Sequence, residues 1–118
     1  QLAAIVDWEL ATIGDPLLDM GWIMATWPDP DGSTTANTIV QPWDGFPAIE
    51  DLMAHYQAHS HRDTSNLRWY GVLGCYKLGI ILEGSYARAC AGKAPVATGE
   101  KLHNHCIKLF QRAQRWID

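Results

Sequence analysis

Only one stretch of this 118-residue chain, residues 2–6, has the character of a β-strand, and its isolation constrains the fold more than any other feature. The stretch is short and apolar and ends in Ile5 and Val6, which favours a buried strand. No second β-rich run with a hairpin turn follows it, so the strand has no partner in the sequence for its backbone hydrogen bonds. We therefore expect a mainly α-helical unit with one short N-terminal strand, and the missing partner suggests that further sequence precedes it.

Four helices are predicted from turn residues and from apolar residues at helical spacing. In the turn Gly14-Asp15-Pro16, Asp15 is expected to cap the first helix and Pro16 to occupy its first position. Gly92 is expected just past the end of the third helix. The glycines inside that helix either interrupt it or let another helix pack closely against it. The predicted helices are 16–26, 47–59, 66–91 and 99–117, with a loop at 28–44.

Composition excludes several classes of protein. The chain is 47% hydrophobic and 19% charged, which is typical of a globular protein. A formal net charge of -4 without a basic stripe argues against nucleic acid as a partner. The apolar runs are too short to span a bilayer and no signal peptide is recognisable, so no membrane partner is expected. Cys75, Cys90 and Cys106 form no CxxC pair, which favours buried, reduced thiols in a cytoplasmic protein.

The acidic residues with the most chemical interest follow the predicted strand. Asp7 ends the strand, where a carboxylate is well placed to bind Mg²⁺, although an acid there is also an ordinary turn residue. Glu9 could add a second carboxylate or orient the water shell of the metal. Asp19 lies among apolar residues of the first helix, so it is expected to accept hydrogen bonds from a neighbouring loop. Residues 7–22 are therefore a candidate metal motif.

The run Ile5-Val-Asp-Trp-Glu9, followed by Gly14-Asp-Pro-Leu-Leu-Asp-Met20, resembles the metal-binding motif of the aminoglycoside phosphotransferase and choline kinase superfamily. Residues 6–16 are most similar to the branch found beside, or fused to, acyl-CoA dehydrogenases. Residues 70, 77–81 and 86–88 resemble the later helices of that branch more loosely. The resemblance implies a partial C-lobe, the C-terminal helical subdomain of a protein-kinase-like fold. It also implies that Asp7 holds Mg²⁺ against the phosphates of ATP, and that Asp15 and Asp19 support the active site, with Asp19 bracing the catalytic loop from beneath.

The sequence departs from the family pattern in what it lacks. The His-Gly-Asp catalytic loop, which the family places just before the strand, does not occur, nor do the Gly-rich lobe and its phosphate-binding Lys. Phosphoryl transfer needs these groups together with the metal. The resemblance thus implies a parent kinase that transfers the γ-phosphoryl group of ATP to a hydroxyl of a small molecule. The 118 residues alone are expected to be inactive and to bind neither ATP nor Mg²⁺ tightly, and no residue among them is a candidate catalyst.

The later helices of such enzymes help to form the cleft for the acceptor substrate, whose identity stays open among aminoglycosides, choline, sugars and hydroxyacyl compounds. Trp69, Tyr70 and Tyr86 could line such a pocket or be core aromatics at helical spacing. Glu83 and Arg88 could recognise substrate or pair with neighbouring residues.

Two further interpretations come from the residues alone. His55 and His59 have a spacing that can bind zinc, but no third ligand is evident, so solvated histidines are favoured. A non-catalytic helical module that binds a partner chain or an apolar ligand is the alternative function, because an unpaired strand can add to another sheet. If the chain is a kinase fragment, the strand and the face once covered by the catalytic loop, near Val6, Asp7 and Asp19, are exposed, so self-association is expected there.

Overall fold

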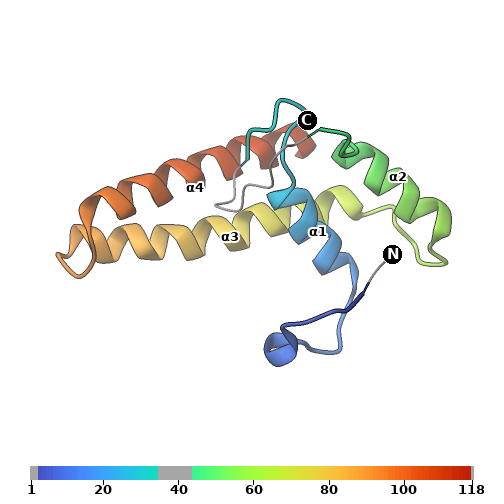
Figure 1. Cartoon of the computed structure of the whole chain (residues 1–118), viewed down its shortest axis with the longest axis horizontal. Coiled ribbons are helices and arrows are strands. Elements are labelled where there is room, and N and C mark those ends of the chain that lie inside the picture. The colour runs from blue at the N-terminus through green and yellow to red at the C-terminus, as the bar shows by residue number, and fades with distance from the viewer. Residues whose placement is uncertain (1–2, 35–43, 118) are drawn as a thin grey trace.

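The computed structural model describes residues 3–34 and 44–117, and within these ranges the protein is mainly α-helical (Figure 1). A 3₁₀ turn, η1 (Trp8–Leu10), precedes α1 (Leu17–Thr26) and α2 (Ile49–His59). The two long helices α3 (Leu67–Cys90) and α4 (Val96–Ile117) follow. All four predicted helices are therefore confirmed, with ends that differ by at most three residues. None of the helices in the described ranges is long and apolar enough to cross a bilayer.

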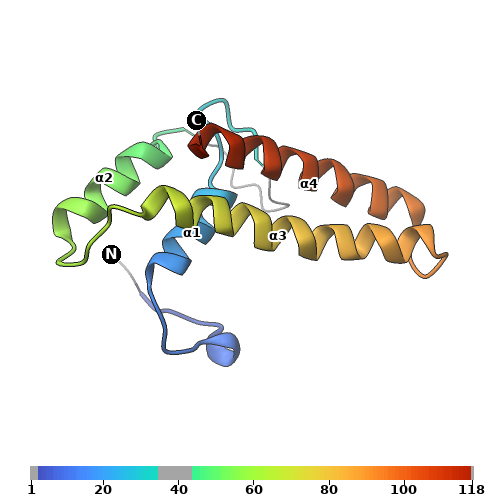
Figure 2. The same cartoon turned by 180° about the vertical axis from the view of Figure 1, so that it is seen from behind.

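The long helices α3 and α4 form an antiparallel hairpin that is the backbone of the fold (Figure 1, Figure 2). Gly92 connects them in the left-handed region, with φ of 69°, as predicted for the residue just past a helix end. The amide of Lys93 donates to the carbonyl of Arg88 across this turn, at 2.9 Å. Helix α1 packs across α3, whereas α2 lies beyond the hairpin, beside the start of α3.

The close contact between α1 and α3 depends on two glycines. A Cβ atom added to Gly21 would overlap the backbone carbonyl oxygen of Tyr70, and one added to Gly74 would overlap that of Gly21. The two backbones therefore touch, which only glycine permits. A Cβ atom on Gly71 would lie 2.6 Å from the Cε atom of Met24, whereas Gly84 faces open space. Gly71 and Gly74 thus allow close packing, and none of the glycines of α3 interrupts the helix.

Two clusters of buried side chains make up the core, and Trp116 packs against both. The first joins α1 to the start of α3 and to one face of α2; its buried members are Leu17, Met20, Met24 and Leu67. The second joins the C-terminal end of α1 to the middle of the hairpin and consists of Ala25, Cys75, Leu109 and Ala113. The core is therefore concentrated where α1 crosses the hairpin.

The predicted strand is wrong for the described residues. Leu2 lies outside them, and residues 3–6 form no regular structure, with Ile5 63% and Val6 77% exposed. Nothing in the described chain pairs with this segment, and an extended segment without a partner cannot satisfy its backbone groups as a strand. Of the predicted loop 28–44, residues 28–34 and 44 are irregular as expected, and 35–43 lie outside the described residues.

Helix α4 begins at Val96, three residues before its predicted start at Gly99. The amide of Gly99 already donates to the carbonyl of Pro95, at 3.1 Å, so Gly99 lies inside the helix. A Cβ atom there would overlap the Cβ atom of Ala89. The glycine is thus needed for close packing against α3, and the sequence pattern mistook it for a helix boundary.

Candidate functional site

The candidate metal ligand Asp7 lies in an exposed turn that leads into η1. Its backbone adopts the left-handed conformation, with φ of 71° and ψ of 51°, and among the described non-glycine residues it alone has positive φ. Asp tolerates this conformation better than most residues, at a cost of about 1–2 kcal/mol. The indole of Trp8 donates to the carbonyl of Ile5, at 2.9 Å, and holds the turn closed. Strained residues of this kind concentrate at functional sites.

Glu9, on the same turn, is also exposed. Within residues 3–34 and 44–117, no group of three or more His, Cys, Asp or Glu side chains is arranged to hold a metal ion. Asp7 and Glu9 therefore form at most a partial set of ligands. Mg²⁺ commonly uses one or two carboxylates and takes its other oxygens from water and phosphate, so the chemistry of these two residues fits this ion.

Asp15 has the capping role that the sequence predicts, and it also has a second hydrogen-bond partner that the sequence does not predict. Its Oδ1 atom accepts from the amide of Leu17 at 3.0 Å, at the start of α1. Its Oδ2 atom accepts from the hydroxyl of Tyr70, at 2.7 Å, although the two residues are 55 apart in sequence. The bond from Leu17 and then that from Tyr70 hold the pKa of the Asp15 carboxyl below its usual value. Asp15 thereby fastens the start of α1, in the middle of the metal motif, to α3.

Asp19 occupies the first turn of α1 but points away from the core. It is exposed, and its carboxylate has no hydrogen bond to any residue that the structure describes, so the predicted contact with a neighbouring loop is not formed here. The apolar residues Leu18, Trp22 and Ile23 on the same helix are also between 37% and 40% exposed. The predicted role of Asp19 in bracing an active site stays a prediction.

Trp69 and Tyr70 are two pocket candidates that the structure brings together. Their rings meet edge to face, with centroids 5.0 Å apart, and with Asn66 they line a cavity of about 360 Å³. The bond from Tyr70 to Asp15 places this cavity beside the metal motif. The hydrogen bond to Asp15 also raises the pKa of the Tyr70 hydroxyl, because the bond holds its proton.

Glu83 and Tyr86 belong to a different group, farther along α3. The Glu83 carboxylate contacts the Nδ1 atom of His103 on α4 at 2.9 Å, and the ring of Tyr86 stacks on the same imidazole with centroids 4.4 Å apart. Thirteen residues of helix separate Glu83 from Tyr70, which corresponds to about 20 Å. Arg88 is exposed at the end of α3 and has no ion pair with a described residue. The five pocket candidates therefore do not form one pocket.

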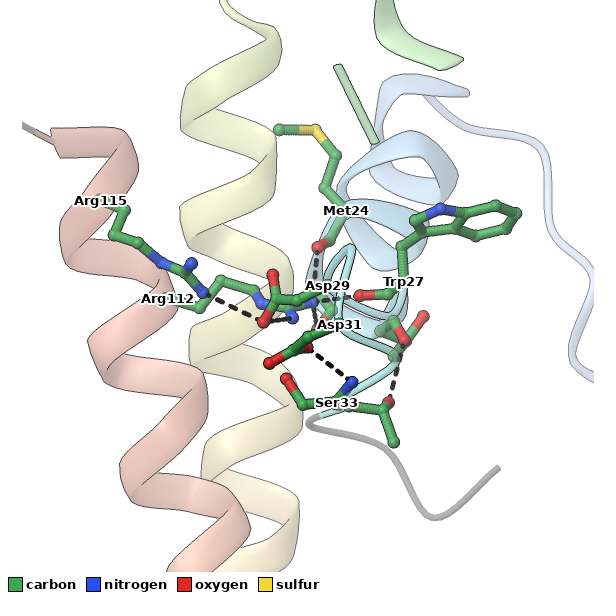
Figure 3. A network of polar contacts seen from close by, with 10 residues as sticks. Met24, Trp27, Asp29, Asp31, Ser33, Arg112 and Arg115 are labelled. Carbon is green, nitrogen blue, oxygen red and sulfur yellow. Dashed lines mark hydrogen bonds and ion pairs between the residues drawn. The ribbon is translucent and has the colours of Figure 1, made fainter. Parts of the chain in front are cut away.

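The side chain that sequence reasoning missed is Arg112, which is only 3% exposed on α4 (Figure 3). Its Nη1 atom donates to the carbonyls of Ala25 at 3.1 Å and of Trp27 at 2.6 Å. Its Nη2 atom pairs with the Oδ2 atom of Asp29 at 2.8 Å. These carbonyls lie at the C-terminal end of α1, where no helical amide remains to bind them. A signal was present in the sequence, since Arg112 lies three residues after Leu109 on the buried face of its helix.

The structure agrees only in part with the prediction that the three cysteines are buried, and it also describes His55 and His59. All three cysteines are free, and Cys75 and Cys106 are buried as predicted, but Cys90 is exposed. Burial raises the pKa of the Cys75 thiol to about 11. His55 and His59 stack on each other, and the Nδ1 atom of His59 contacts the carbonyl of His55.

Comparison with known proteins agrees with the resemblance in the sequence. Residues 1–59 match the phosphotransferase enzyme family, and this range includes the whole metal motif. Acyl-CoA dehydrogenase family member 11 of Rattus norvegicus is 29% identical over 96 residues, which cover 78% of this chain and 12% of that protein. Family member 10 of Mus musculus is 25% identical over 108 residues, 86% of this chain and 10% of that protein. The chain thus spans about a tenth of the length of these relatives. No solved structure matches it significantly.

Proposed function

Because the chain belongs to the phosphotransferase enzyme family, we propose that it is the C-terminal helical part of a small-molecule kinase. The reaction proposed for the whole enzyme is transfer of the γ-phosphoryl group of ATP to a hydroxyl group of its substrate. The observation that carries this proposal is the family match over residues 1–59, which contains Asp7 and Glu9 on one exposed turn.

In the proposed enzyme, Asp7 binds Mg²⁺ and Glu9 either adds a second carboxylate or orients the water shell of the metal. The bound ion would neutralise charge on the phosphates during transfer. Asp15 holds the start of α1 against α3, since it accepts hydrogen bonds from Leu17 and from Tyr70 at once. The residues that bind the nucleotide and position the acceptor hydroxyl would come from sequence outside this chain, and the chain alone is proposed to be inactive.

The cavity lined by Trp69 and Tyr70 is the proposed contribution of this chain to acceptor binding. Its position beside the metal motif supports this role, as does the aromatic wall that it offers to a substrate. Both relatives are named as acyl-CoA dehydrogenase family members, so a hydroxyl-bearing acyl compound is the first acceptor to test. Glu83, Tyr86 and Arg88 lie too far along α3 to share this cavity.

The first test is the reading frame upstream of Gln1. A His-Gly-Asp loop and a Gly-rich lobe are expected there, and a start codon directly before Gln1 would contradict the kinase and favour the non-catalytic helical module. The second test measures ATP consumption by the protein encoded by that frame. Asp7→Asn should reduce it at least a hundredfold, whereas Asp44→Asn, at another exposed aspartate, should leave it unchanged. Equal activity of the two variants would refute the role of Asp7.

We also propose that the 118-residue chain self-associates through its N-terminal segment. Ile5, Val6, Trp8 and Ile13 expose most of their apolar surface, and such patches favour association. Sedimentation velocity should show dimers or larger species that become monomers when Trp8 and Ile13 are replaced by Ser. A monomer at high concentration before replacement would contradict the proposal. A cytoplasmic location is proposed as well, and the three free thiols support it.

A further inference from the structure

A second cavity is lined by Met24, near the C-terminal end of α1, and by Asp29 just after that helix. Figure 1 shows that this end of α1 lies away from η1. Its volume is about 230 Å³, and side chains from all four helices and from the segment after α1 line it. Its polar wall consists of Arg68, Arg112, Arg115, Asp29 and Glu50. This cavity is separate from the proposed kinase site, and the argument that follows does not depend on that proposal.

The charges around the cavity do not balance. Three guanidinium groups face two carboxylates, and one of these, Asp29, is already shared between Arg112 at 2.8 Å and Arg115 at 3.6 Å. Arg68 forms no ion pair with any residue in the described ranges. An adjoining cavity shares Asp29 and Arg115 and adds Lys108 to its wall. The surroundings of the cavity are therefore positive, and they favour a bound anion.

Arg112 adds a second, independent observation. Its residue is 3% exposed, and its Nε atom is buried without a hydrogen-bond partner, although both Nη atoms are bonded. A buried donor left without an acceptor costs about 1–3 kcal/mol, so such groups are uncommon unless something satisfies them. Because Arg112 lines the cavity, its buried and incompletely bonded guanidinium adds positive charge to the cavity wall.

The remaining wall of the cavity is apolar and comes from Met24, Ile49, Met53 and Trp116. A purely inorganic anion would leave this surface unused. The volume is below the range of about 300–1,000 Å³ that is usual for drug-sized ligands, so a nucleotide or a long chain does not fit. Arginine binds carboxylates through paired hydrogen bonds, which suits the exposed guanidinium groups of Arg68 and Arg115.

We propose that this cavity binds a small organic anion, a carboxylate with a short apolar tail. The carboxylate is held by Arg68 and Arg115, and the tail lies against Ile49, Met53 and Trp116. Arg112 and Asp29 fix the floor of the site, since their bonds join α4 to the end of α1 (Figure 3).

Titration of the ¹⁵N-labelled chain with hexanoate, followed by two-dimensional NMR, tests the proposal. The indole signal of Trp116 and the amides at the starts of α2 and α3 should shift and saturate. Hexanol and inorganic phosphate serve as probes that keep only the tail or only the charge, and each should bind at least tenfold more weakly. Arg68→Gln should weaken hexanoate binding about tenfold, as expected for loss of one charged hydrogen-bonding partner.

Arg88→Gln is the matched control, because Arg88 is also exposed on α3 but lies 20 residues away, at its other end. It should leave hexanoate binding unchanged, and the unperturbed spectrum of each variant reports whether the fold is kept. The proposal is overturned if hexanoate gives no saturable shift, or if Arg88→Gln weakens binding as much as Arg68→Gln. Binding of hexanol or phosphate as tight as that of hexanoate would overturn it as well.

Discussion

Gly74 and Gly84 both lie in helix α3, yet replacing each by alanine should change the free energy of unfolding in opposite directions. Both replacements remove the conformational freedom of glycine from a helix interior, which stabilises by up to about 1 kcal/mol. At Gly84 nothing lies within 4 Å of the added methyl group, so the gain is kept. We therefore expect Gly84→Ala to stabilise the protein by about 0.5–1 kcal/mol.

At Gly74 the added methyl group meets backbone atoms. It would overlap the carbonyl oxygen of Gly21 and lie 3.2 Å from the amide nitrogen of Trp22. A backbone cannot rotate away as a long side chain can, so α1 must move off α3 and open part of the core. Overpacking of this kind costs about 1–3 kcal/mol, which exceeds the gain in helix propensity. We expect a net loss of about 1–2 kcal/mol for Gly74→Ala.

Urea unfolding at 25 °C, followed by circular dichroism, measures both changes, and an unchanged dependence on urea would show that the comparison is valid. The thermal midpoints should differ by roughly 4 °C or more for each kcal/mol between the variants. If Gly74→Ala is as stable as the unmodified protein, the close crossing of α1 and α3 is not as described. If Gly84→Ala is destabilised equally, the loss does not come from that crossing.

Three further predictions concern other parts of the molecule. Arg112→Met should lower the free energy of unfolding in urea by about 3 kcal/mol, because several buried carbonyls lose their donor. A loss below about 1 kcal/mol would show that the bonds from Arg112 to these carbonyls do not hold α4 against the end of α1. Iodoacetamide at pH 8 should alkylate the exposed Cys90 in the folded protein. Cys75 is buried and its pKa is raised to about 11, so it should react only after unfolding. Mass spectrometry that finds both cysteines modified equally fast would contradict this. Tyr70→Phe should raise the pKa of Asp15 in an NMR titration. That pKa is depressed in the folded state, so the stability it provides is present above pH 3.8 and is lost as the pH falls through the folded value. The variant should therefore lose less of its free energy of unfolding on acidification. An unchanged pKa of Asp15 would show that Tyr70 does not lower it.

The bond between Tyr70 and Asp15 has the most direct bearing on the proposed kinase. It connects the start of α1, within the metal motif, to the hairpin through one hydroxyl group, at 2.7 Å. The close crossing of Gly21 and Gly74 brings the same two helices together. A change that separates α1 from α3 would therefore also break this contact within the metal motif.

Much of the local structure could be predicted from the sequence. The turn at Gly14-Asp15-Pro16, the glycine at position 92 and the apolar spacing placed all four helices, because capping and periodicity act over a few residues. The isolated apolar run at residues 2–6 was mistaken for a strand, since a strand exists only with a partner. Gly99 was mistaken for a helix start because its contact with Ala89 lies on another helix.

By itself, then, the sequence determined the helices, the cap at Asp15 and the motif at residues 7–22 that places the chain in its family. Only the tertiary structure decided that the hydroxyl of Tyr70 binds Asp15 while its ring lines a cavity, and that Glu83 contacts His103. It also decided that Arg112 is buried beneath the end of α1. The physical reason is distance along the chain: each of these contacts joins residues 20 or more apart, and its geometry is set by how closely the helices pack.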